Sequence, residues 1–189
     1  MRYRRSQSFS LGSIGYLVVT NLILYIATSI NDELIRFFGL QPASFWTRPW
    51  TIVTNLFIHD PFPGFWHILA NMITLYFFGS YLIRLVGEKR FLITYFCGGI
   101  LGNIFYMLLE SSGPTAIGAS GAVFAMAGAL TVMRPKERVF IIPIPVPLPL
   151  WVAVIGGFLI LSFFPYVAWQ AHLGGLVFGL IAGYFFRRR

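Results

Sequence analysis

The chain has 189 residues, of which 57% are hydrophobic, 18% aromatic and only 11% charged, and its formal net charge is +8 at pH 7. This balance excludes an ordinary soluble domain and indicates a membrane protein. The basic residues lie scattered at the ends of apolar runs, which argues against a nucleic-acid partner. The single cysteine, Cys97, excludes an intrachain disulfide and has no obvious metal-binding partners.

Uncharged runs predict transmembrane helices, because about 20 apolar residues cross the hydrocarbon core of a bilayer. The run over 139–186 is long enough for two crossings, and Pro165 is the natural place to divide it. We therefore expect residues 1–189 to form a single all-α membrane domain, a bundle of six transmembrane helices. The predicted helices cover 12–30, 65–86, 90–110, 116–133, 148–164 and 167–186.

The positive charges predict the orientation of these helices. With the basic residues at the helix ends included, alternate connecting segments hold 12 and 2 Lys and Arg residues, and the positive-inside rule places the richer set in the cytoplasm. Both termini are therefore expected to be cytoplasmic. The arginines before the first helix also resemble the start of a signal peptide, but no convincing small-residue cleavage site follows.

The segment 31–64 is too long for a simple turn and mixes aromatic residues with Arg36 and Arg48. This mixture is typical of interfacial segments, so we expect a loop half sunk in the outer leaflet. In the next predicted helix, His67 and Asn71 are four residues apart and share one face. Intramembrane polar side chains of this kind either join helices or line a functional site.

The sequence Gly118-Ala119-Ser120-Gly121 opens another apolar run, so Ser120 is expected near the start of a helix. Gly118 and Gly121 let other backbone approach, and the free N–H groups of a first helical turn attract negative charge. This arrangement suits a reactive serine. Small residues near a helix start are also explained by close packing alone.

Two stripes of small residues, four apart, predict where two helices touch backbone to backbone. The stripe in the last predicted helix consists of Ala171, Gly175, Gly179 and Gly183, and the stripe after Ser120 consists of Gly121, Ala125 and Ala129. Ser120 and His172 each lie one residue from a stripe. If the stripes meet, the hydroxyl and the imidazole come within reach of each other.

These side chains predict the chemistry of acyl transfer. A serine hydroxyl needs a neighbouring base, and His172 is the only suitable base on a facing helix. Because no Asp or Glu lies at this depth in the three helices, we expect a Ser-His dyad in place of a triad. His67, Asn71 and the Ser120 amide would then stabilise the oxyanion. No cofactor and no metal is expected.

The motifs GASG at 118–121, HxxxN at 67–71 and AHLGG at 171–175, in this order on six apolar segments, resemble the rhomboid family of intramembrane serine proteases. The resemblance implies that Ser120 is the nucleophile, His172 its general base, and His67 and Asn71 oxyanion donors with the Ser120 amide. It implies a site that opens to the extracellular or periplasmic side of a cell membrane. Substrates would be single-pass membrane proteins.

The resemblance also implies that the fifth helix and the 162–166 loop act as gate and cap for a substrate helix. The chain departs from the family pattern in several places. Trp50-Thr51 stands where many members have Trp-Arg, Phe124 where a tyrosine is common, and Ile83 where a glutamate is common; the stretch from His59 to His67 is longer than usual. Phe124 can still stack on His172.

Three alternatives remain open at this point. One is a catalytically inactive rhomboid-like protein that binds membrane helices, although such relatives characteristically lack the serine or the histidine. Another is a small transporter, in which buried polar residues mark a path, although no internal repeat is evident. The third is a zinc site formed by His59, His67 and His172, although their spacing matches no local metal motif.

Overall fold

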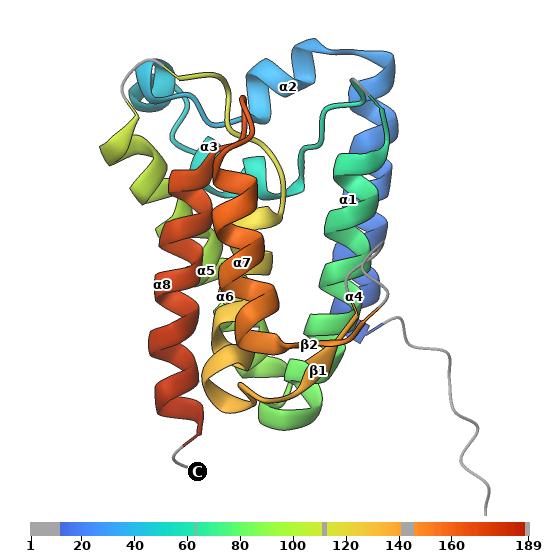
Figure 1. The fold of residues 1–189 in the computed structure, drawn as a ribbon. Helices are drawn as coiled ribbons and strands as arrows, with labels where there is room; N and C mark the ends of the chain where they lie inside the picture. The colour runs from blue at the N-terminus through green and yellow to red at the C-terminus, as the bar shows by residue number, and fades with distance from the viewer. Residues whose placement is uncertain (1–11, 63, 111–112, 141–145, 188–189) are drawn as a thin grey trace, which may run out of the picture.

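The computed structural model describes residues 12–62, 64–110, 113–140 and 146–187. Within this part of the chain the fold is predominantly helical, and its longer helices form one bundle (Figure 1). These helices are α1 (Gly12–Ile30), α4 (Trp66–Val86), α5 (Glu88–Leu109), α6 (Ser120–Met133), α7 (Leu150–Ser162) and α8 (Trp169–Phe186). The N-terminal arginines that entered the orientation argument lie outside the described residues.

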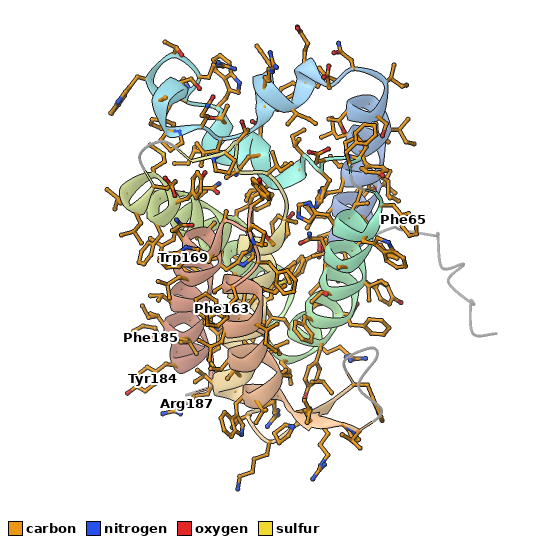
Figure 2. All side chains as sticks on the ribbon, turned by 45° about the horizontal axis from the view of Figure 1, so that its top comes forward. Phe65, Phe163, Trp169, Tyr184, Phe185 and Arg187 are labelled. Carbon is orange, nitrogen blue, oxygen red and sulfur yellow. The ribbon has the colours of Figure 1, made fainter. Side chains whose placement is uncertain are left out.

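Four of these helices, α1, α4, α5 and α8, are long and apolar enough to cross a membrane. The other two are apolar but shorter, with 14 residues in α6 and 13 in α7. Large apolar side chains on the outside of the bundle fit a lipid environment. Figure 2 shows Phe65 beside α4 and Phe185 on α8 in such positions, and these two side chains are 51% and 62% exposed.

Three predicted helices begin two or more residues later than the sequence suggested; one of them, expected over 167–186, is α8, which begins at Trp169. The helix expected over 116–133 begins only at Ser120, because Ala116 pairs with Leu40 in an isolated β-bridge and Gly118 has a φ of +106°. The helix expected over 148–164 is α7, which covers 150–162. The helix begins later because proline is not tolerated in a helix interior, where its ring clashes with the preceding turn and it lacks an N–H group. Pro149 accordingly has an extended conformation.

Residues 148 and 149 belong instead to a short antiparallel pair of strands. In this pair β1 (Arg138–Val139) lies beside β2 (Leu148–Pro149). Helical periodicity in the sequence contains no signal for this strand pair. The pair ties the start of α7 to the end of α6, because the Leu150 amide also donates to the Glu137 carbonyl at 2.7 Å.

The segment between α1 and α4 contains four short helices, at the end of the bundle drawn uppermost in Figure 1. They are α2 (Glu33–Phe38), the 3₁₀ helix Pro42–Thr47, α3 (Thr51–Thr54) and the 3₁₀ helix Asn55–Phe57. Side-chain bonds hold the segment together: Trp50 Nε1 donates to the Phe37 carbonyl at 3.1 Å, the Arg48 guanidinium donates to the Arg36 carbonyl, and Thr54 Oγ1 donates to the Phe38 carbonyl at 2.8 Å. Its depth in a membrane stays a prediction.

Helix α6 lies at the centre of the bundle and packs most extensively against α8 and α5. The two stripes of small residues meet, as their spacing predicted. A Cβ atom on Gly175 would overlap the carbonyl oxygen of Gly121, and one on Gly179 would overlap that of Ala125. Because any side chain there would push α8 away from α6, these glycines fix the distance between the two backbones.

Helix α7 is only loosely enclosed by its neighbours. It contacts α6, α8 and the strand pair, and only Leu150 and Val154 among its residues are buried. A Cβ atom on Gly156 or Gly157 would meet no atom within 4 Å. Little packing therefore opposes a movement of this helix.

Candidate active site

A serine and a histidine from two different helices meet where α6 and α8 cross. Ser120 Oγ lies 2.8 Å from His172 Nε2. Ser120 is the first residue of α6 and His172 lies in the first turn of α8, directly after Ala171. A Cβ atom on Gly121 would lie 3.3 Å from the Ala171 carbonyl oxygen, so the small side chains beside both residues bring them together.

The imidazole of His172 is held by an aromatic ring. Phe124, one turn after Ser120 on α6, stacks on it with the ring centroids 4.6 Å apart and the planes 28° apart. The histidine is only 6% exposed, and its Nδ1 atom has no hydrogen-bond partner among the described residues. Within the described chain no carboxylate orients the imidazole, whose partners on α6 are the Ser120 hydroxyl and the Phe124 ring.

The structure places the two residues of the HxxxN motif at the start of α4. The His67 ring faces Gly118: a Cβ atom there would lie 2.8 Å from His67 Nε2. The Asn71 amide instead donates to the His67 carbonyl at 2.9 Å, within its own helix. His67 thus lies against the loop that leads to Ser120, whereas the Asn71 side chain is engaged locally.

From its place in the GASG motif we expected Gly118, like Gly121, to pack one helix closely against another. The structure instead places it outside any helix–helix contact. It lies in the loop before α6, where its φ of +106° and the nearby His67 ring both require a residue without a side chain. Its amide donates to the Asn55 carbonyl at 2.9 Å. The segment after α1 therefore supports the turn that presents Ser120.

A pair of buried amides supports this turn from α5. Asn55 and Asn103 exchange two hydrogen bonds, of 3.0 Å and 2.7 Å, and Asn103 Nδ2 also lies 2.7 Å from the Ile52 carbonyl oxygen. Sequence patterns alone indicated no role at the site for either asparagine. An asparagine inside an apolar run is the signal that points to such a partner.

The structure bears on the metal alternative as well. Within the described residues, no group of three or more His, Cys, Asp or Glu side chains could hold a metal ion. The His59 and His67 rings are neighbours, with centroids 5.0 Å apart. The nearest partner atom of His172 is the Ser120 hydroxyl, so the zinc hypothesis gains no support from this arrangement.

The arrangement is suited to nucleophilic chemistry. A hydroxyl within hydrogen-bond distance of an imidazole can transfer its proton as it attacks an electrophile. Ser120 begins a helix, and the N–H groups of a first helical turn have no partners within the helix and attract developing negative charge. Several apolar helices long enough to cross a membrane, with this pair held between two of the helices in the bundle, indicate a helical, multi-pass membrane protein.

Comparison with known proteins identifies the family. The family model described as Rhomboid domain matches residues 47–189, which is more than half of the chain. The chain therefore belongs to the rhomboid family. It is 30% identical over 155 residues to Rhomboid protein 1, mitochondrial, of Saccharomyces cerevisiae, covering 71% of this chain and 41% of that protein.

Two further relatives show a similar degree of likeness. Presenilin-associated rhomboid-like protein, mitochondrial, of Mus musculus is 29% identical over 191 residues, covering 89% of this chain and 48% of that protein. Rhomboid-like protease 3 of Toxoplasma gondii is 29% identical over 127 residues, covering 62% of this chain and 47% of that protein. The chain thus spans less than half the length of these three relatives.

Proposed function

We propose that this chain is an intramembrane serine protease that hydrolyses a peptide bond of single-pass membrane proteins near the outer membrane face. The observation that carries the proposal is the 2.8 Å distance between Ser120 Oγ and His172 Nε2 inside an apolar bundle. Membership of the rhomboid family supports the same reaction class. The presence of both residues argues against the alternative of an inactive protein that binds membrane helices.

The first half of the reaction forms an acyl-enzyme. Ser120 Oγ attacks the carbonyl carbon of the scissile bond while His172 Nε2 takes its proton, and the carbonyl oxygen becomes an oxyanion. The imidazolium then gives that proton to the leaving amine as the C–N bond breaks. In the second half, His172 takes a proton from water as the water oxygen attacks the acyl carbon. The ester bond between that carbon and Ser120 Oγ then breaks, the new carboxyl end of the substrate is released, and the imidazolium returns its proton to Ser120 Oγ.

The oxyanion is assigned to the Ser120 amide, His67 and Asn71. Preorganised donors of this kind are commonly worth about 3 to 4 kcal/mol each in acyl transfer. His67 already lies beside the loop before Ser120. The Asn71 amide must turn away from the His67 carbonyl, to which it donates in this structure, before it can reach the substrate oxygen.

Because no carboxylate of the described residues contacts the imidazole, Phe124 takes over part of the role of that third group. The stacked ring fixes the plane of the imidazole, and the face of an aromatic ring attracts the imidazolium that forms during the reaction. Orientation of the base therefore depends on packing. No cofactor or metal has a part in the proposed mechanism.

In the proposed membrane arrangement all six long helices cross, with both termini in the cytoplasm. Figure 1 shows the start of α1 and the end of α8 at the same end of the bundle, and the Ser13 amide donates to Glu88 at the turn between α4 and α5. That end also carries the basic residues that follow α6. Ser120 lies toward the opposite end, so the site would open to the outer side.

We assign the gate for a substrate helix to α7 and the cap to residues 162–166. The weak enclosure of α7 and the open space around Gly156 and Gly157 support this assignment. Residues of the cap are largely exposed, including Phe163 at 87% and Tyr166 at 92%. Movement of α7 would admit a substrate helix laterally to the dyad. The natural partners are accordingly single-pass membrane proteins and the surrounding lipids.

Labelling with a serine-directed fluorophosphonate tests the proposal. We expect the probe to attach at Ser120 in the full chain, and attachment to be lost in Ser120→Ala and in His172→Ala. Ser29→Ala is the matched control, since Ser29 is an exposed serine that bonds to its own helix. Labelling that persists in Ser120→Ala, or continued processing of a co-expressed membrane substrate by that variant, would overturn the assignment.

A further inference from the structure

A second histidine lies behind the candidate site. His59 follows the 3₁₀ helix Asn55–Phe57 and is fully buried. Its carbonyl oxygen accepts a hydrogen bond from Thr28 Oγ1 of α1 at 3.1 Å. Its ring packs against His67 of α4, with centroids 5.0 Å apart and planes 61° apart. His59 thus fills the space between α1 and the proposed oxyanion donor.

The buried polar ring of His59 lowers the free energy of unfolding. Neither Nδ1 nor Nε2 makes a hydrogen bond of good geometry among the described residues, and the nearby backbone of Phe57 favours the protonated ring only weakly. A neutral imidazole carries one donor and one acceptor, and each one left unpaired in the interior costs about 1–3 kcal/mol. A phenylalanine ring would occupy much the same space without that cost. Unpaired buried groups of this kind are concentrated at functional sites, where stability and activity conflict.

The ring nitrogens of the two histidines converge on one small space. A Cβ atom on Gly118 would lie 2.8 Å from His67 Nε2 and 3.7 Å from His59 Nε2. Both atoms therefore face the gap left by the missing side chain of Gly118, two residues before Ser120. His67 Nε2 therefore shares this gap with a second polar atom, His59 Nε2.

We propose that His59 is a positioning residue that acts through His67. Its polar ring edge keeps His67 Nε2 turned toward the loop at Gly118, and so toward the Ser120 amide beside which the oxyanion forms. Burial lowers the pKa of His59 to about 3, so this neighbour stays neutral and places no second positive charge beside His67. The inference rests on the proposed function and assigns a residue to which that function gives no role.

The test combines a conservative pair of variants with a double-mutant cycle. His59→Phe keeps the size of the ring and removes its nitrogens, so we expect the full chain to fold with an unfolding temperature at least as high as that of the unmodified protein. A displaced catalytic donor commonly costs up to about 100-fold in rate. We expect kcat on a membrane substrate to fall at least about tenfold in His59→Phe, with KM within about twofold.

The same substitution in a His67→Ala background distinguishes positioning from a structural role. If His59 acts through His67, His59→Phe causes no further loss of kcat once His67 is absent. His59→Gln, which retains a polar end, should recover part of the activity. If His59→Phe does not accumulate, the comparison of His59→Gln with His59→Leu in both backgrounds serves the same purpose.

Two results would overturn the inference: full kcat in His59→Phe, or losses that multiply with that of His67→Ala. Neither result would contradict the proposed function if fluorophosphonate labelling still requires Ser120. Conversely, substrate cleavage that survives Ser120→Ala would refute the protease itself. The two failures are therefore distinguishable in one series of variants.

Discussion

His172 Nε2 lies 2.8 Å from Ser120 Oγ, although the two residues are 52 positions apart in the chain. The contact depends on residues without side chains. Gly121 and Gly175 allow the backbones of α6 and α8 to touch, and the serine and the histidine follow from that crossing. Activity should therefore be sensitive to changes in packing as well as to changes in the dyad.

Gly175→Ala tests this dependence. Because the added methyl group would overlap the Gly121 carbonyl oxygen, α8 must move, and overpacking of this kind costs typically 1–3 kcal/mol. We expect a lower unfolding temperature in detergent and a loss of fluorophosphonate labelling. Gly157→Ala on α7 is the matched control: its methyl group meets no atom within 4 Å, so stability should be unchanged or higher. Equal behaviour of the two variants would contradict the packing argument.

Phe124→Leu tests whether stacking orients the base. Aromatic pairs contribute about 0.5–1.5 kcal/mol beyond their buried area, which corresponds to a loss of roughly 2- to 12-fold in kcat if it is used in the transition state. Phe124→Tyr keeps the ring and should remain close to the unmodified rate. The measurement is kcat on a membrane substrate with KM determined in parallel. A leucine variant with undiminished kcat would remove Phe124 from the mechanism.

Phe158→Ala tests the assignment of α7 as gate. The Phe158 ring meets the edge of Phe124 at a centroid distance of 6.0 Å and links α7 to the site. Its loss should free α7 and raise kcat/KM on a membrane substrate several-fold, while the labelling rate with the small fluorophosphonate changes little. Leu159→Ala, at a half-exposed neighbouring position, should alter neither. A fall in kcat/KM for Phe158→Ala would indicate that α7 serves only to support the fold.

The buried His59 predicts a dependence of stability on pH. Its pKa in the folded protein is about 3, below the ordinary value of 6.5, because burial disfavours the charged ring. In this interval the unfolded chain binds the proton first, so stability present above pH 6.5 is lost as the pH falls toward 3. By pH 5 the loss attributable to His59 is about 2 kcal/mol.

His59→Phe should remove this contribution. The difference in unfolding free energy between His59→Phe and the unmodified chain is therefore expected to grow between pH 7 and pH 5 and to be constant above pH 7. Denaturation in detergent at several pH values measures it. A difference that does not change with pH would show that the ring is hydrated in solution.

Much of the fold was accessible from the sequence because its signals are local. The bounds expected for α1 and α4 agree with the structure to within one residue, since uninterrupted apolar runs define them. The start of α6 was missed by four residues. Ala116 to Ala119 have the composition of a helix, but a bridge to Leu40 and the conformation of Gly118 hold them in a loop.

In the candidate site, too, some residues could be predicted from the sequence and others could not. Ser120 and His172 could be paired in advance, because the stripes beside them set the register of one helix on the other. The support from Asn55, Asn103 and His59 was not predictable, since each depends on a contact between segments with no shared period. His59 in particular was considered only as a metal ligand, whereas the structure shows it buried behind His67.

The sequence by itself determined that the chain is an apolar helical bundle and that a hydroxyl and an imidazole flank its two small-residue stripes. Hydrophobic runs and four-residue spacing carry that information within a single helix. Only the tertiary structure decided that the turn at Gly118 lies against His67, with His59 enclosed behind it. Those contacts arise where a loop, α1 and α4 meet, and their geometry depends on how separate elements pack, which no local pattern encodes.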